Sequence, residues 1–250
     1  MRYFAPLTLL FFTVLGIEIF AESQHALLVD GGQALGTLDN YLLTIWITKP
    51  LLMPILLAIF LLNKGKLKSS EKRYFPIALV LSLFGDIFLM FESKDLFVFG
   101  LGSFLVGHLL FVLSFRDRIR AAKPSSMRKI LTIIPFLAFV IGFLVFLHGH
   151  FSGNAEKEPF FIPVSVYATV IGLMGITAAL RINGTSNRGF ILVMLGALIF
   201  IASDSCIALD RFVFRVTETD LGMPYGSIII MLTYGIAQYL LTIGTLKSNK

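Results

Sequence analysis

Eight runs of mostly apolar residues divide the chain, each about 20 residues long, the length with which an α-helix crosses a lipid bilayer. The runs lie at roughly 3–22, 41–62, 74–91, 97–115, 129–148, 159–180, 189–210 and 225–246. Runs of this length favour helices, in which every backbone polar group is satisfied within the segment. We therefore predict an all-α membrane protein, a bundle of eight transmembrane helices that forms one domain over residues 1–250.

The composition excludes most soluble classes of protein. Charged residues make up 14% of the chain and the apolar set AVILMFWYC makes up 56%, whereas a soluble domain carries about 25% charged residues. A soluble enzyme, a nucleic-acid-binding protein and a disordered tail are therefore disfavoured. The single cysteine, Cys206, lies inside an apolar run, so we expect neither an intramolecular disulfide nor a cysteine-based metal site.

The basic residues predict the orientation of the bundle. If all eight runs cross the membrane, sixteen of the 21 Lys and Arg residues fall on one side. The other side receives only Lys94, Lys157, Arg211 and Arg215, and Lys49 lies within a run. Cytoplasmic loops carry the excess of basic residues and contact anionic lipid there. We therefore predict a multi-pass protein of the cell membrane with both termini in the cytoplasm, and an external loop over 23–40.

The first run also has some features of a cleaved signal peptide, since Arg2 precedes it and Ala21-Glu22-Ser23 follows it. Glu18 within the run and the lack of a clean A-x-A site favour a retained helix.

A weak internal repeat relates the two halves of the chain. Leu83-Phe84-Gly85-Asp86 resembles Ile201-Ala202-Ser203-Asp204, and Gly107-His108-Leu109-Leu110 resembles Ala237-Gln238-Tyr239-Leu240. The copies are four runs apart. An even number of crossings predicts two parallel four-helix repeats, related by an axis along the membrane normal.

Few ionisable residues lie within the runs, and such residues usually mark functional sites because burying a charge in lipid is costly. They are Glu18, Lys49, Asp86, His108 and Asp204, with Asp210 near the end of a run. Asp86, Asp204 and Lys49 are predicted at similar depth in the outer half of the bilayer. We expect them to line one polar cavity, with His108 and Gln238 deeper, and we expect Glu18 to extend toward the interface.

Structural roles remain open for the same residues. Asp86 can pair with Lys49 as a packing contact, and Lys49 can be a counter-ion or contact a lipid headgroup. His108 can form an interhelical hydrogen bond. Tyr234 and Gln238, one helical turn apart, can bond each other or line the cavity. A zinc site needs about three converging ligands, and only one of the four His residues lies within a run, so we predict no metal and no cofactor.

Several segments, in this order, resemble the YhhN-like lysoplasmalogenase family of membrane hydrolases over roughly residues 41–246. They are Lys49-Pro50-Leu51-Leu52-Met53-Pro54, Ala78 through Gly85-Asp86 to Met90, Phe99-Gly100-Leu101-Gly102-Ser103-Phe104, Gly107-His108-Leu109-Leu110, Gly196-Ala197 through Ser203-Asp204-Ser205 to Arg211-Phe212, and Tyr234 with Ala237-Gln238. The resemblance implies hydrolysis of the vinyl-ether bond of a lysoplasmalogen, with a fatty aldehyde and a glycerophosphocholine or glycerophosphoethanolamine as products. Relatives acting on other ether lipids or lysolipids would fit the same pattern.

The candidate residues suit that chemistry. Hydrolysis of a vinyl ether begins with protonation of its β-carbon and continues through an oxocarbenium ion that water attacks. Glycosidases handle a similar cation with two carboxyl groups, and Asp86 and Asp204 are predicted to divide the same roles. The sequence does not tell which is the acid, and a protonated His108 is a second candidate. The residues predicted to bind substrate are Lys49, His108, Tyr234, Gln238, Ser82 and Ser203.

Two other classes of function remain as alternatives. Paired membrane carboxylates and parallel repeats are also features of proton-coupled transporters, and a structural membrane protein is the third option. The expected partners are a lysophospholipid and the surrounding membrane lipids, without nucleic acid. The oligomeric state stays open.

Overall fold

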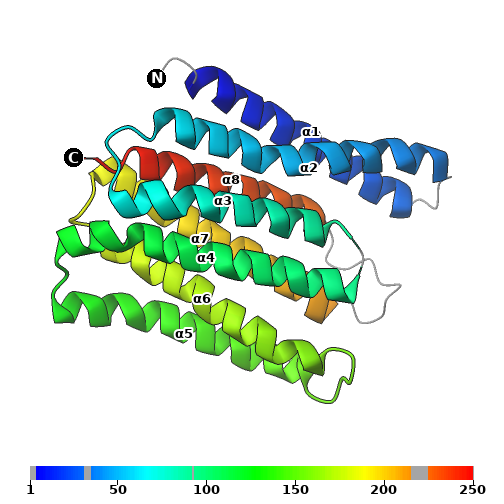
Figure 1. The fold of residues 1–250 in the computed structure, drawn as a ribbon. Helices are drawn as coiled ribbons and strands as arrows, with labels where there is room; N and C mark the ends of the chain where they lie inside the picture. The colour runs from blue at the N-terminus through cyan, green and yellow to red at the C-terminus, as the bar shows by residue number, and fades with distance from the viewer. Residues whose placement is uncertain (1–3, 31–34, 92, 215–224, 250) are drawn as a thin grey trace.

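The computed structural model describes residues 4–30, 35–91, 93–214 and 225–249, and this part of the chain forms eight α-helices without a strand. The all-α prediction is confirmed. The helices run alternately up and down in one bundle, with α1 and α2 at one edge and α5 at the other (Figure 1). Their bounds are α1 Phe4–Asp30, α2 Leu35–Asn63, α3 Ser69–Leu89, α4 Lys94–Ala122, α5 Ser126–Phe151, α6 Phe161–Leu180, α7 Asn187–Leu209 and α8 Gly226–Leu246. A short 3-10 helix, η1 (Glu158–Phe160), precedes α6, and a π-helical turn, η2 (Asp210–Phe214), follows α7.

Among the described residues, seven of the helices are long and apolar enough to cross a membrane. The exception is α3, the third predicted span. Every stretch of 18 residues within α3 contains Lys72, Arg73 and Asp86, so its uninterrupted apolar part is short. It packs between α2 and α4 in the bundle, with Asp86 buried and Lys72 and Arg73 exposed.

The predicted loop over 23–40 is wrong. Helix α1 continues to Asp30 and α2 begins at Leu35, so only residues 31–34, which lie outside the described part, separate the two helices. Residues 23–30 contain neither Gly nor Pro, and the first Gly residues after the apolar run are Gly31 and Gly32. The helix therefore continues beyond the apolar run until the sequence offers a break.

Glycine residues allow close approach within two antiparallel helix pairs, α3 with α4 and α7 with α8. A Cβ atom on Gly85 would lie 2.5 Å from the Phe104 ring, and one on Gly244 would lie 2.7 Å from the backbone nitrogen of Val193. Small residues at such contacts are typical of membrane helix packing. The two pairs hold corresponding positions in the predicted repeat, which itself stays a prediction.

A buried ion cluster joins the helices at the end of the bundle that carries most of the basic residues. The Glu71 carboxylate accepts two hydrogen bonds of 2.9 Å from Arg118 and lies 3.6 Å from Arg181. Arg181 donates to the Ser248 hydroxyl (2.6 Å) and Arg118 to the Asn249 side chain (2.8 Å), so the cluster also holds the segment after α8. Burial lowers the pKa of Arg181 to about 10, against the opposing effect of Glu71. The Arg181 guanidinium is therefore charged at neutral pH, and the Glu71 side chain lies between it and Arg118.

The arrangement of the helices allows a direct test of the predicted membrane topology. The connections at 64–68, 123–125 and 181–186 lie at the same end as both termini, opposite the α5–α6 connection (Figure 1). With Cys206 replaced by Ser, a Ser69→Cys variant should react with a membrane-impermeant maleimide only in permeabilised cells. An Asn154→Cys variant should react in intact cells. The reverse labelling pattern would overturn the predicted cytoplasmic termini.

Removing the one carboxylate of the ion cluster should destabilise the protein. Glu71→Gln leaves two buried guanidinium groups without a counter-charge, and breaking a buried pair in this way costs about 3–5 kcal/mol. We expect a clearly lower apparent melting temperature in detergent for Glu71→Gln. The exposed Glu156, changed to Gln, serves as the control and should melt like the wild type. Equal melting temperatures for both variants would contradict a stabilising role for the cluster.

Candidate active site

The first polar group of the bundle interior is centred on Asp86, which is 4% exposed. The Tyr234 hydroxyl on α8 donates to Asp86 Oδ2 over 2.9 Å. Toward the basic end of the bundle, Gln238 donates to the Ser82 hydroxyl over 3.0 Å and lies 3.4 Å from the Tyr234 hydroxyl. Two residues of α3 thus face two of α8. Tyr234 and Gln238 also contact each other, which is the first of the two alternatives considered from the sequence.

The second polar group is centred on Asp204 of α7. Tyr167 on α6 donates its hydroxyl to Asp204 Oδ2, and His108 Nε2 on α4 lies 3.8 Å from the same oxygen. His108 Nδ1 lies 2.7 Å from the carbonyl oxygen of Phe104. A carbonyl oxygen only accepts, so Nδ1 carries the hydrogen, and in the neutral ring Nε2 presents its lone pair. Nε2 is buried and has no hydrogen-bond partner among the described residues.

Aromatic rings connect the two groups. The Phe200 ring, which is fully buried, meets the His108 ring edge-on at 4.6 Å and the Tyr234 ring at 5.5 Å between centroids. The His108 and Tyr167 rings lie 5.5 Å apart. The two Asp residues are also close enough to interact electrostatically. They therefore belong to one continuous interior region, although they lie on different helices.

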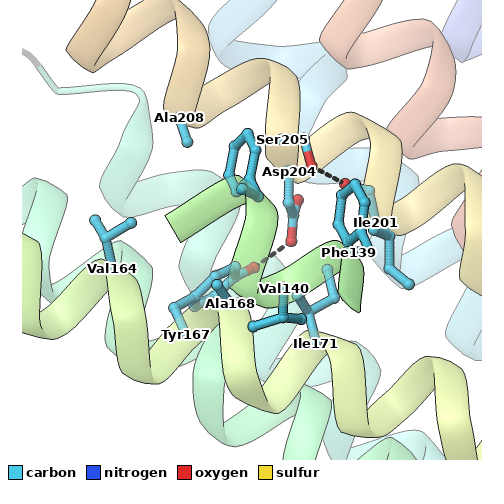
Figure 2. Close-up of a pocket in the computed structure, with 11 residues that line it drawn as sticks. Phe139, Val140, Val164, Tyr167, Ala168, Ile171, Ile201, Asp204, Ser205 and Ala208 are labelled. Atoms are coloured by element: carbon cyan, nitrogen blue, oxygen red, sulfur yellow. Dashed lines mark hydrogen bonds between the residues drawn. The ribbon is translucent and has the colours of Figure 1, made fainter. Parts of the chain in front are cut away.

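Two small apolar cavities flank Asp204. The α5 cavity has a volume of about 30 Å³ and is lined by Phe139, Val140, Phe143, Val164, Tyr167, Ala168, Ile171, Ile201, Asp204, Ser205 and Ala208 (Figure 2). The α4 cavity has a volume of about 40 Å³ and is lined by Leu89, Phe97, Leu101, Phe104, Val164, Tyr167, Asp204, Ile207, Ala208 and Phe212. Each has room for a water-sized group, which needs about 10–15 Å³. Asp204 and Tyr167 belong to both linings, so this carboxyl–phenol pair lies between the cavities.

The prediction that Asp86, Asp204 and Lys49 line one cavity is wrong for these two cavities. Of the three, only Asp204 lines either one, and neither His108 nor Gln238 does. Asp86 faces α8, where Tyr234 fills the adjacent space. The spacing along each helix predicts depth in the membrane, but the direction of a side chain around the helix axis depends on packing.

Lys49 has a different partner from the one expected. Its ammonium group lies 3.6 Å from the carboxylate of Glu22 on α1, and its charge reaches Asp86 only at longer range. The expectation that Glu18 extends to the interface is also wrong. Glu18 is fully buried and accepts a hydrogen bond from Thr48, because α2 packs over this face of α1.

Tyr167 is the residue that the sequence analysis missed. It lies within the apolar run 159–180, away from the interfaces where tyrosine is most common in membrane helices. A tyrosine at that position was the signal in the sequence that could have identified this residue. Ser203, in contrast, is fully buried and donates to the carbonyl oxygen of Ile230, a contact between α7 and α8. Its role in substrate binding stays a prediction.

Potential metal ligands are sparse around Asp204. In the described part of the chain, no three His, Cys, Asp or Glu side chains converge as a metal site would require. His108 and Asp204 approach each other as a pair. The absence of a metal from the chemistry stays a prediction.

Comparison with known proteins identifies relatives for most of the chain. The model of the YhhN family matches residues 44–245. Lysoplasmalogenase TMEM86A of Bos taurus is 33% identical over 177 residues, which are 70% of this chain and 65% of the relative. A lysoplasmalogenase of Mycobacterium tuberculosis is 34% identical over 175 residues, 70% of this chain and 60% of the relative. No solved structure matches the chain.

The matches to these two relatives thus span 60–65% of the length of the relatives. The family match over residues 44–245 includes α3 through most of α8 and the greater part of α2, and so contains both Asp-centred groups. Helix α1, with Glu18 and Glu22, lies before it.

Proposed function

The chain belongs to the YhhN family, and we propose that this multi-pass membrane protein hydrolyses the vinyl-ether bond of lysoplasmalogens. The products are a fatty aldehyde and a glycerophosphocholine or glycerophosphoethanolamine. Relatives named lysoplasmalogenase support this class of substrate. The main structural support is the location of Asp204 and Tyr167 between two apolar cavities, where a proton donor meets the region that a lipid substrate can enter.

In the proposed first step, Asp204 is the acid. Tyr167 and His108 both face Oδ2, so Oδ1 carries the proton toward the substrate. The π electrons of the vinyl ether take this proton at the β-carbon and form a C–H bond. The other vinyl carbon and the ether oxygen become an oxocarbenium ion, and Asp204 becomes a carboxylate. The chemistry matches the acid step of glycosidases, which also generates an oxocarbenium ion.

In the second step, water attacks the oxocarbenium carbon. The lone pair of His108 Nε2 accepts one proton of this water, and a hemiacetal forms. The hemiacetal then breaks its bond to the glycerol oxygen, which takes the proton from His108. The hydroxyl proton of the hemiacetal returns to Asp204, and the aldehyde is released. Both side chains recover their starting states. His108 acts as a base here, since its Nδ1–H is engaged with Phe104, in place of the acid role considered from the sequence.

The second carboxyl, Asp86, stabilises the cation from a distance. It is held by Tyr234 and interacts electrostatically with Asp204 across the aromatic side chains of the interior. In a region without bulk water, such a fixed polar group acts more strongly than it would in solution. Lys49 and its partner Glu22 contribute to the electrostatic potential around the site.

The first catalytic prediction concerns the two carboxyls. Purified protein in detergent should release aldehyde from a lysoplasmalogen. General acid and base groups contribute roughly 10²–10⁴-fold each. Asp204→Asn should therefore lower turnover by at least about 100-fold, and Asp86→Asn, which removes the electrostatic stabiliser of the cation, by about 100-fold. Lys49→Met should have a smaller effect.

Asp95→Asn is the matched control, because Asp95 is exposed at the start of α4. Near-normal turnover in either site variant removes that residue from the mechanism. Failure of the wild type to release aldehyde, together with proton-dependent uptake into proteoliposomes, would favour the transporter. Detergent leaves no compartments, so aldehyde release there cannot reflect transport.

A second prediction isolates Tyr167. Tyr167→Phe keeps the ring in both cavity linings but removes the hydroxyl that holds Asp204 Oδ2. A hydrogen bond to a charged group contributes about 1.5–3 kcal/mol, so turnover should fall by about 10- to 100-fold while KM changes little. Tyr239→Phe is the control, since Tyr239 stacks on Phe11 at the α1–α8 contact. Equal turnover in the two variants would show that the Tyr167 hydroxyl does not position the acid.

A further inference from the structure

Two cationic side chains contact residues that line the α4 cavity. The Arg211 guanidinium lies 4.3 Å above the centre of the Phe97 ring. The Lys157 ammonium donates to the backbone carbonyl oxygen of Phe212 over 3.0 Å. Phe97 and Phe212 both line this cavity, and their rings meet edge-on at 6.1 Å. The two cations therefore lie against the lining of a cavity that Asp204 also lines.

The location of these cations is unusual for this protein. Sixteen of the 21 Lys and Arg residues are predicted on the opposite side of the membrane, and four on this one. Two of those four, Lys157 and Arg211, contact the lining of the same cavity although they are 54 positions apart in the sequence. Both are partly exposed and lie at or next to the ends of membrane spans, the depth of lipid headgroups.

The separation along α7 matches the dimensions of a lysophospholipid. Arg211 follows Asp204 by seven residues, which corresponds to about 10 Å at the rise of an α-helix. In a lysoplasmalogen, about seven covalent bonds link the phosphorus to the β-carbon of the vinyl ether, an extended distance of about 9 Å. A lipid with its vinyl ether at Asp204 thus has its phosphate near Arg211.

We propose that Arg211 and Lys157 form the binding site for the phosphate of the substrate, with the glycerol backbone on the side of the α4 cavity, beside Phe97 and Phe212. This site rests on the proposed function for the class of its ligand. A guanidinium binds phosphate through paired hydrogen bonds, and an ammonium adds a point charge. The hydrocarbon chain then extends from Asp204 in the opposite direction, past Ile201 of the α5 cavity.

The site recognises the phosphate and not the amine of the headgroup, because two cations repel choline and ethanolamine alike. Lipids with these two headgroups should therefore bind with similar affinity. An ether lipid that lacks the phosphate should bind far more weakly to the wild type.

The experiment measures binding of a saturated 1-O-alkyl lysophospholipid, which has no vinyl ether and cannot be hydrolysed by the proposed reaction. In detergent, Arg211→Gln and Lys157→Gln should each raise its Kd by about tenfold or more, equivalent to about 1.4 kcal/mol. Arg211→Lys keeps the charge and should retain most of the affinity. Arg188→Gln, at an exposed position on the basic end, is the matched control and should bind like the wild type. A 1-O-alkylglycerol without phosphate should bind all of these proteins equally.

Unchanged Kd values for the phosphate-containing lipid in both Gln variants would overturn the site. An equal loss of affinity for the phosphate-free alkylglycerol would overturn it too, because the change would then be structural. Poor folding of one Gln variant shows as a lowered melting temperature, and the Kd of the other Gln variant then decides the matter. Binding of a saturated ether does not depend on hydrolysis. Failure of aldehyde release with phosphate-dependent binding intact would therefore refute the proposed function and leave the phosphate site standing.

Discussion

A polar side chain inside a bilayer must find its partner within the protein, because lipid offers none. The interior of this bundle is organised by that constraint. Three carboxyls are each bonded by a hydroxyl from a different helix, Asp86 by Tyr234, Asp204 by Tyr167 and Glu18 by Thr48, while the buried Glu71 is paired with arginines. These contacts link α3 to α8, α6 to α7 and α1 to α2. They fix the helices around the polar interior and at the same time hold the acids in defined orientations.

Stability favours tight packing and catalysis needs space beside the reacting groups. The bundle meets these two demands at different levels along its length. At the basic end, Glu71 is enclosed by Arg118 and Arg181, and the segment after α8 covers them. Around Asp204 the packing is looser, and two cavities remain. The ion cluster fixes one end each of α3, α4 and α6, and the same helices carry Asp86, His108 and Tyr167 farther along their length. A tightly bonded end thus supports an interior that contains small cavities.

The sequence predicted the elements well and their lateral arrangement poorly. Eight apolar runs became eight helices, because length and hydropathy alone decide that question. Asp86 and Asp204 were recognised because a charge in an apolar run is conspicuous. Lys49 paired with Glu22, Glu18 was buried, and Tyr167 was overlooked, since each outcome depends on how neighbouring helices rotate. A helix periodicity limits which residues share a face, but only tertiary packing decides what that face meets.

The same packing distinguishes two carboxyls that the sequence could not separate. Asp86 and Asp204 each accept a hydrogen bond from a tyrosine, yet only Asp204 lines the two cavities. In the proposed reaction this asymmetry assigns the acid: a proton moves to carbon only from a group that contacts the substrate. It also separates the products. The aldehyde leaves along the apolar α5 cavity toward lipid, and the glycerophospho product leaves past Arg211 toward the interface, so neither product has to pass the other. A site between two cavities therefore suits a reaction that divides one amphipathic molecule into an apolar and a polar part.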